Sequence, residues 1–437
     1  MRYRLAGLAT ALLLACSTHA QTPASGSAPT TVLKAAHLFD GRSGALLSPG
    51  LVVVQGDRIV AVGANAAVPA GAKIIELGDA TLVPGYIDAH THIAYDHDDD
   101  WAQGFYEGML RFPVEQSFHA GRNAKVTLLS GVTSARDLGA GDFIDVALRN
   151  AIDAGLTQGP RMLVAGHALG STGGHCDSSP FPPERVTPSG PLEGVCNGPE
   201  ECRLATRLQM KYGADVIKIC ASGGVLSESD PVDVPQLTPD ELAAIVSEAH
   251  AWNRKVAAHG HGDVAARQAI EAGVDSIEHG SFLRPDTLRL MKHKGVYLVP
   301  TRLALVWTVG HADGYPPKIA AKARAAGQSH DRMFKDALDI GVPIAFGTDA
   351  AVSPHGINAQ EFGDMVDLGM TPSAALLSSS QGAATLLGID GETGTLEAGK
   401  LADIVAVPGD VLQDIRATER PLLVMKQGVL VRANSGE

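Results

Sequence analysis

Four histidines, one aspartate and one lysine occupy matching positions in separate segments of this 437-residue chain. Each one follows a short apolar run rich in Val and Ile and precedes a turn that contains Gly or Ser, as expected at the end of a parallel β-strand. The six are His90 and His92 in PGYIDAHTH, Lys218 in DVIKICASGG, His259 in KVAAHGHG, His279 in SIEHGS and Asp349 in IAFGTDA. Imidazoles and carboxylates are typical zinc ligands, so the pattern predicts that these side chains meet and bind metal.

The spacing of His90 and His92 is informative by itself. Residues two apart on a strand point to the same face, so both imidazoles are expected on one side. Two core histidines satisfied by hydrogen bonds would give the same local pattern. The occurrence of His259, His279 and Asp349 at equivalent strand ends favours the metal site.

Lys218 lies between Ile217 and Ile219, inside an apolar run. A lysine ammonium has three donors and no acceptor, so it cannot ligate a metal without modification. A structural lysine paired with Asp215, or a surface charge, is the alternative interpretation. Because the flanking residues are apolar, we expect Lys218 to be buried near the other five residues.

The segment that contains these residues alternates strand and helix patterns from about Pro84 to Gly394. Eight βα units predict a (β/α)8 TIM barrel, an α/β fold, with its site at the carboxyl ends of the strands. A doubly wound open sheet is the alternative. It would spread ligands on the first, fourth, fifth, sixth and eighth strands along a line, whereas a closed barrel brings them together. The predicted strands are 86–92, 132–138, 161–168, 215–221, 255–261, 276–280, 296–301 and 343–350.

Both chain ends outside this segment are rich in short strand patterns. Residues 31–84 and 395–437 contain period-2 alternation and Gly-Asp turns, for example LVVVQGDRIVAVG and LADIVAVPG. We therefore predict a small β-sandwich domain built from 31–84 plus 395–437, and a barrel domain over 85–394.

The first twenty residues are typical of a signal peptide. Arg2 and Arg4 precede the apolar run LAGLATALLLA, which is too short to span a bilayer, and a small-residue cleavage site ends at Ala20. Residues 21–30 form a polar, flexible leader. We predict export to the periplasm or the medium. LLAC, ending at Cys16, offers a lipoprotein signal as the alternative, and only such lipidation would attach the chain to a membrane.

Export makes the cysteines candidates for disulfides. Cys176 and Cys196 flank a Pro/Gly-rich loop and are the preferred pair, while Cys196–Cys202 is the alternative. Cys220 is expected to be buried and free. A zinc–cysteine site is the weaker interpretation, because the chain contains no CxxC spacing.

Composition limits the partners. The net charge of −13 argues against nucleic acid or an anionic membrane surface as the main partner. No P-loop or GxGxxG fingerprint occurs in the right context, so no nucleotide cofactor is implied. We therefore expect the partner to be a small-molecule or peptide-like substrate.

Taken together, PGYIDAHTH, AHGHG, EHGS, GTDA and GTLEAGKLADIV resemble the metal-dependent amidohydrolase superfamily. Within it, the chain is similar to exported dipeptidase- and prolidase-like enzymes with a binuclear centre. The segments STGGH, KYGADVIKICASGGVLS and TDAAVSPHG resemble bacterial ochratoxin-degrading amidohydrolases. The resemblance covers nearly all of the chain after the signal peptide.

The resemblance implies two divalent metal ions, with zinc expected. Lys218 is then carboxylated by CO2 to N6-carboxylysine, and its carbamate bridges both metals. The implied ligands are His90, His92, Lys218 and Asp349 for the first metal, and Lys218, His259 and His279 for the second. A hydroxide shared by the metals attacks the substrate, and Asp349 acts as general base and then acid; a ligand-only role for Asp349 is the alternative.

Further residues are candidates for substrate contact. His261 follows His259 by two and should face the same site, where it is assigned to the scissile carbonyl or oxyanion; support of a metal ligand is the alternative. His175 and His355 lie in loops that could reach substrate. Arg302 could pair with a substrate carboxylate or lie solvated at the rim. Val225 and Leu226 are expected to line a side-chain pocket or to pack in the ordinary way.

The implied reaction is hydrolysis of the amide or peptide bond of N-acyl amino acids or dipeptides with a free C-terminal carboxylate. Ochratoxin A, cleaved to ochratoxin alpha and phenylalanine, is the specific candidate. A cyclic amidase or deaminase of the same superfamily is the alternative; mononuclear deaminases generally lack the bridging lysine. A non-enzymatic scaffold is a remote alternative, because all six ligand positions are filled. Homo-oligomers, octamers among them, are implied for this branch.

Overall fold

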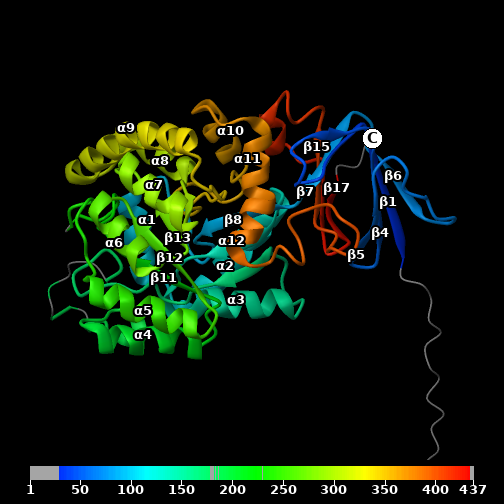
Figure 1. The fold of residues 1–437 in the computed structure, drawn as a ribbon. Helices are drawn as coiled ribbons and strands as arrows, with labels where there is room; N and C mark the ends of the chain where they lie inside the picture. The colour runs from blue at the N-terminus through cyan, green and yellow to red at the C-terminus, as the bar shows by residue number, and fades with distance from the viewer. Residues whose placement is uncertain (1–28, 178–181, 183, 186, 229, 434–437) are drawn as a thin grey trace, which may run out of the picture.

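The structure is a computed structural model that describes residues 29–177, 182, 184–185, 187–228 and 230–433. It has a mixed α/β fold with a large helix-rich part and a smaller β-rich part (Figure 1). The predicted signal peptide, Cys16 and all but the last two residues of the leader fall outside the described residues. No helix within those residues is long and apolar enough to cross a membrane.

The β-rich part combines both ends of the chain, as predicted. One sheet has the order β5-β4-β1-β6, and a second has the order β17-β16-β15-β7-β2-β3. In the second sheet β15 pairs antiparallel with both β7 and β16, so strands some 320 residues apart are neighbours. The strands are β1 (Thr30–Ala35), β2 (His37–Phe39), β3 (Leu46–Leu47), β4 (Gly50–Gln55), β5 (Arg58–Val62), β6 (Lys73–Glu76), β7 (Ala80–Pro84), β15 (Ile404–Pro408), β16 (Leu423–Lys426) and β17 (Val429–Ala433).

The two sheets share one hydrophobic core. Leu33, Val52 and Ile59 from the first sheet pack with Leu82 and Ile404 from the second, and all five are fully buried. This burial of apolar side chains from both termini is the main stabilising contribution to the β-rich part. Both ends of the chain therefore fold into one β-rich part, which lies at one side of the helix-rich insert (Figure 1).

Among the described residues, the helix-rich part has seven parallel strands, whose neighbours in each sheet follow one another in the chain. They form two assigned sheets, β10-β9-β8 and β11-β12-β13-β14. Their residues are nearly all buried, as expected for parallel strands covered by helices. The strands are β8 (Tyr86–Thr91), β9 (Val132–Asp137), β10 (Arg161–Val164), β11 (Val216–Cys220), β12 (Lys255–Gly260), β13 (Ser276–His279) and β14 (Tyr297–Val299).

The eighth predicted strand, 343–350, is not a regular strand. Isolated parallel bridges instead pair Ile344 with Leu298 of β14 and Ala350 with Thr91 of β8. The carbonyl of His90 accepts from the backbone N–H groups of both Thr348, at 3.2 Å, and Asp349, at 2.7 Å. The left-handed backbone of Asp349, with φ of 57°, interrupts the ladder at this point. The segment nevertheless lies between β14 and β8.

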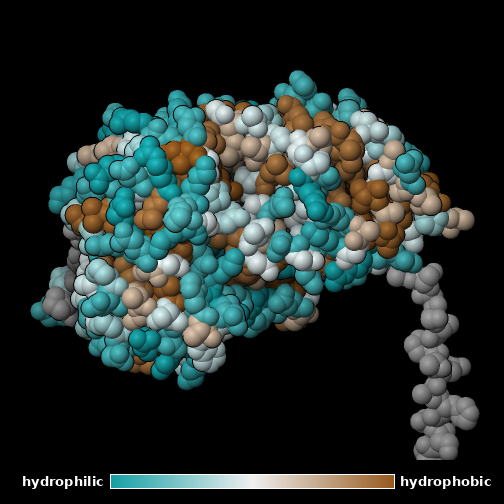
Figure 2. Space-filling view, in the orientation of Figure 1, coloured by the Kyte–Doolittle hydropathy of each residue, from teal (hydrophilic) through white to brown (hydrophobic). Residues whose placement is uncertain are grey.

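Helices surround these parallel strands, and polar side chains cover much of their outer surface in the view of Figure 2. The start of α5 shows why a helix forms there: the Thr238 and Glu241 side chains each accept from the other's backbone N–H, and Pro239 follows the cap. The helices are α1 (Trp101–Leu110), α2 (Pro113–Leu129), α3 (Ile144–Asp153), α4 (Pro199–Lys211), α5 (Pro239–Ala251), α6 (Asp263–Ala272), α7 (Pro285–Lys294), α8 (Arg302–Gly310), α9 (Pro317–Ile340), α10 (Gln360–Asp367), α11 (Pro372–Leu377) and α12 (Ala383–Leu387).

The disulfides differ from the preferred prediction. Cys176 is bonded to Cys220, with Cα atoms 5.8 Å apart, and Cys196 is bonded to Cys202, at 4.9 Å. The predicted Cys176–Cys196 pair and the free Cys220 were therefore wrong, while the alternative Cys196–Cys202 pair is confirmed. The cause is a parallel bridge between Leu169 and Ile219, which brings the loop after β10 beside the end of β11.

Candidate metal centre

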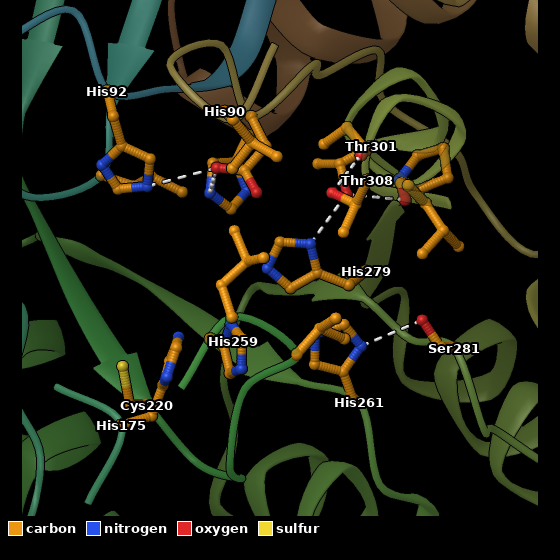
Figure 3. A pocket seen from close by; sticks show the side chains of 18 of the residues that line it. His90, His92, His175, Cys220, His259, His261, His279, Ser281, Thr301 and Thr308 are labelled. Carbon is orange, nitrogen blue, oxygen red and sulfur yellow. Dashed lines mark hydrogen bonds and ion pairs between the residues drawn. The ribbon is translucent and has the colours of Figure 1, made fainter. Parts of the chain in front are cut away.

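The predicted ligands converge on one pocket of about 230 Å³ at the carboxyl ends of the parallel strands (Figure 3). All six lie on its wall. They come from β8, β11, β12, β13 and the 343–350 segment, so residues far apart in the chain meet there. The pocket is lined by His90, His92, Leu138, Ala168, His175, Cys176, Lys218, Cys220, Val225, Leu226, His259, His261, His279, Ser281, Pro300, Thr301, Ala304, Leu305, Thr308, His330, Asp349 and Val352.

Two groups of side chains could each hold a metal ion. One is His90, His92 and Asp349, and the other is His259, His261 and His279; within each group the ligand atoms lie within 4.8 Å of one another. In the first group the Nε2 atoms of His90 and His92 are each 3.4 Å from Oδ1 of Asp349. Two His-rich groups in one pocket are consistent with a binuclear centre.

Hydrogen bonds orient the rings of the first group. His90 hydrogen-bonds Oε2 of Glu278 through Nδ1, at 2.8 Å, and His92 donates from Nδ1 to the carbonyl of Gly139, at 3.1 Å. Each contact leaves Nε2 directed at Asp349. A ligand histidine whose second nitrogen is fixed in this way has a defined tautomer and orientation.

The rings of the second group are held in the same manner. His259 donates from Nε2 to the carbonyl of Gly223, at 3.1 Å, whereas His279 hydrogen-bonds Oγ1 of Thr301 through Nδ1, at 2.7 Å. His261 hydrogen-bonds Oγ of Ser281 through Nδ1, at 2.9 Å. One nitrogen of every ring is thus left for another partner.

The donor set fits divalent metal ions. The buried Nε2 of His90 has no hydrogen-bond partner among the described residues, which is costly unless a ligand is bound. Burial lowers the pKa of His92 to about 4 and holds the pKa of His90, His259 and His279 well below the usual range. The imidazoles are therefore neutral near pH 7, the form that ligates metal.

Lys218 lies within the pocket and is only 3% exposed. Burial lowers the pKa of Lys218 to about 8, although the nearby carboxylates of Glu278 and Asp349 oppose this shift. A lowered pKa increases the fraction of neutral amine, which is the form that can react with an electrophile such as CO2.

Comparison with known proteins agrees with this geometry. A model of the amidohydrolase family matches residues 81–431, which is most of the chain. The chain belongs to the amidohydrolase family. With its ligand groups, it is a metal-dependent hydrolase of this family.

The relatives of this amidohydrolase include peptide- and amide-cleaving enzymes. Ochratoxinase of Aspergillus niger is 35% identical over 419 residues, covering 91% of this chain and 85% of its own. The crystal structure of a Xaa-Pro dipeptidase with bound methionine superposes with a TM-score of 0.88 at 36% identity, over 92% and 99% of the two chains. A prolidase complexed with N-methylphosphonate-L-proline gives a TM-score of 0.85 at 30% identity, over 93% and 100%.

Backbone strain occurs at three of the pocket's strand ends in the amidohydrolase. His279, Thr301 and Asp349 have left-handed backbones, with φ of 68°, 48° and 57°. Residues other than glycine adopt this region at an energetic cost, and they do so mainly at functional sites. The packed strands therefore hold these side chains in directions that a regular strand would not give.

Glu278 is a buried site residue that the sequence reasoning missed. It hydrogen-bonds His90 and also accepts from Nη2 of Arg136, at 2.9 Å. Side chains of neighbouring strand residues normally point to opposite faces, so Glu278 would be expected to point away from His279. The left-handed φ of His279 breaks this alternation, and both side chains reach His90. The acidic residue before His279 in SIEHGS was the available signal.

Replacing Glu278 with glutamine should weaken the centre and the fold. The variant leaves the Arg136 guanidinium buried without its carboxylate, a loss of about 3–5 kcal/mol in the free energy of unfolding. Loss of the hydrogen-bonded support of His90 should lower metal affinity roughly 10–100-fold. Denaturant unfolding measures the loss of stability, and metal titration measures the loss of affinity. Glu271→Gln, at an exposed position of α6, is the control. Wild-type values for both would show that Glu278 plays neither role.

Of the residues predicted to contact substrate, some line the pocket and others do not. His175, His261, Val225 and Leu226 line the pocket. Arg302 and His355 do not line it. Arg302, the first residue of α8, forms an ion pair from Nη1 to Asp331 of α9 at 2.7 Å, and His355 donates from Nε2 to the carbonyl of Tyr95 at 2.7 Å. Arg302 is therefore ion-paired with Asp331 and lies outside the pocket lining, and its contact with a substrate carboxylate stays a prediction.

Proposed function

We propose that this hydrolase cleaves the amide bond of N-acyl amino acids or dipeptides that have a free C-terminal carboxylate. Ochratoxin A, cleaved to ochratoxin alpha and phenylalanine, is the specific candidate. The observation that carries the proposal is the convergence of Lys218 with the two histidine groups in a single pocket. Similarity to an ochratoxinase and to prolidase-type dipeptidases supports this substrate class.

Two zinc ions would share the predicted ligands. His90, His92, Asp349 and a carboxylated Lys218 would hold the first, and His259, His279 and the same Lys218 would hold the second. Bound there, the ions would activate a water molecule as nucleophile and polarise the scissile carbonyl. A lysine in the pocket disfavours a mononuclear deaminase, because an unmodified ammonium adds a positive charge and no ligand.

Asp349 is positioned to move the proton. In the metal-free pocket, burial raises the pKa of Asp349 to about 6, opposed by the nearby Lys218. A carboxylate next to the attacking water can accept a proton and return it. The carboxylate of Asp349 would take a proton from the attacking water and deliver it to the nitrogen of the leaving amine. Oδ1, which lies 3.4 Å from Nε2 of both His90 and His92, would be the oxygen that ligates the metal.

His261 is positioned to stabilise the developing negative charge on the carbonyl oxygen. When the Ser281 hydroxyl donates to Nδ1 of His261, Nε2 bears the proton and can donate to the substrate. Burial lowers the pKa of His261 to about 3, so the ring acts as a neutral donor. Its place beside His259 and His279 makes a role as metal ligand the competing assignment.

The variant His261→Ala separates these two roles. We expect roughly 100-fold lower kcat with metal content retained, since one oxyanion donor is lost. Steady-state kinetics and metal analysis of the same sample provide the readout. A variant that has lost metal would instead identify His261 as a ligand.

The remaining wall suits an apolar side chain. Leu138, Val225, Leu226, Leu305 and Val352 all line the pocket. Burial of an aromatic side chain such as phenylalanine against them would contribute to binding. Arg302 is ion-paired outside the pocket, so the substrate carboxylate would be met by neutral donors or by the metal ions.

We further propose that the parallel strands and the 343–350 segment close into a (β/α)8 barrel over 85–394. The bridges Leu169–Ile219, Leu298–Ile344 and Thr91–Ala350 support closure, because they link the neighbouring segments that the regular strand ladders leave unpaired. Residues 31–84 and 395–437 would form the β-sandwich domain. The two disulfides support export. We also propose that the protein forms a homo-oligomer, for example an octamer.

A panel of substrates tests the function. It contains N-acyl-L-amino acids, Xaa-Pro and other dipeptides, ochratoxin A, cyclic amides, and the methyl ester of one active acid. We expect hydrolysis of the free acids, with the ester slower, because the carboxylate is part of recognition. Exclusive turnover of cyclic amides, or hydrolysis of none of these compounds by metal-loaded protein, would contradict the proposal.

A further inference from the structure

The loop that follows β10 forms part of the pocket wall. Within this loop, Leu169 donates to the carbonyl of Lys218 at 2.8 Å and accepts from the backbone N–H of Cys220 at the same distance. The loop then returns to the pocket at His175 and Cys176, both of which line it. One loop therefore meets the lysine-bearing strand at two points.

The second meeting point is the disulfide between Cys176 and Cys220. Cys220 lies two residues after Lys218 and also lines the pocket. Figure 3 shows Cys220 and His175 side by side next to His259. The cross-link thus lies in the wall of the metal centre, directly after His175 in the chain. The Cys196–Cys202 disulfide, in contrast, joins residues outside the pocket lining.

The His175 side chain is closely confined. Its ring stacks on that of His259, with centroids 4.4 Å apart and planes at 28°. A Cβ atom on Gly224 would lie 2.0 Å from Cε1 of His175, so the ring occupies space that only a glycine leaves open. The backbone N–H of His175 donates to Oε1 of Gln236 at 2.8 Å. These contacts fix the imidazole at one edge of the pocket.

One polar atom of this confined ring is unused. The buried Nδ1 of His175 has no hydrogen-bond partner among the described residues. A buried polar atom without a partner is unfavourable, so a molecule that supplies the partner binds more tightly. The ring lines the pocket and lies outside the predicted set of metal ligands, so a substrate bound in the pocket is the group that would contact it.

We propose that the Cys176–Cys220 disulfide positions His175 as a substrate-contacting residue of the metal centre. The inference rests on the hydrolase function proposed above. Without the cross-link, the loop would keep its pairing at Leu169 but lose the restraint next to His175, and the ring could leave its place over Gly224. A less ordered His175 imidazole would weaken substrate binding more than it would lower the stability of the fold.

Matched cysteine variants test the role of the disulfide. Cys176→Ser/Cys220→Ser removes the pocket disulfide, and Cys196→Ser/Cys202→Ser removes the other as control. We expect the first to lower kcat/KM about 10-fold, mainly by raising KM, with metal content unchanged, as loss of a positioned hydrogen bond does. The control should retain wild-type kcat/KM. The assay uses whichever acid the wild-type protein hydrolyses best.

A double-mutant cycle with His175→Ala makes the test specific. If the disulfide acts through His175, removing it in the His175→Ala background should cost no further activity. Gly224→Ala, which displaces the ring with both disulfides intact, should match His175→Ala. Additive losses, loss of metal, or unfolding of the pocket variant at assay temperature would overturn the proposal, as would wild-type kinetics. Failure of the wild-type protein to hydrolyse any acid contradicts the proposed function instead.

Discussion

Replacing Lys218 with alanine is expected to remove most bound metal and to lower kcat/KM by roughly 1,000-fold or more, since both ions would lose a shared ligand. Lys218 is buried in the pocket, and burial lowers the pKa of its amine to about 8. Its carbamate is the only proposed ligand common to the two histidine groups. Elemental analysis of metal per chain and steady-state kinetics measure both losses.

Chemical rescue distinguishes ligation from folding in the Lys218→Ala variant. A small carboxylate such as propionate can supply the missing oxygens in the vacated space, and it should restore part of the metal content and the activity. Lys211→Ala, on the exposed last turn of α4, serves as the control and should behave as wild type. A fully metallated, active Lys218→Ala protein would exclude the bridging role.

Replacing Asp349 with asparagine is the second change with a large expected effect. The substitution keeps the shape of the side chain but removes the proposed proton acceptor, and we expect roughly 100- to 10,000-fold lower kcat. Metal at the first group should weaken as well, because Oδ1 is 3.4 Å from Nε2 of both His90 and His92.

The kinetics of Asp349→Asn need a matched carboxylate control. Asp286→Asn removes an exposed carboxylate from the first turn of α7, whose ion pair with Arg289 is at the surface and contributes little. It should retain wild-type kcat. If Asp349→Asn also turned over at the wild-type rate, another group would have to move the proton.

The main elements of the fold were predictable because each has a local sequence signal. Apolar runs that end in Gly- or Ser-bearing turns located the strands of the helix-rich part, and the period-2 spacing of His90 and His92 placed both rings on one side. Alternating strands at both termini predicted the β-rich part that β7 and β15 join.

The remaining features depend on contacts between distant residues. The partner of Cys176 is set by the Leu169–Ile219 bridge, which no local pattern encodes. Glu278 reaches His90 only because the backbone of His279 is left-handed. Arg302 follows an apolar strand as expected, but its guanidinium forms an ion pair with Asp331 on α9 and does not line the pocket. The disulfide partner and the directions of these side chains are therefore set by tertiary packing and ion pairing, which a local sequence pattern does not show.

Metal reconstitution tests the central claim most directly. Chelator-stripped protein would be titrated with zinc in bicarbonate buffer, and hydrolysis of an N-acyl-L-phenylalanine would be measured against the zinc bound per chain. If the protein is a two-metal amide hydrolase, the stripped protein will show no turnover and the rate will reach its maximum at two bound ions per chain. Full activity without metal, or no hydrolysis with two ions bound, would contradict it.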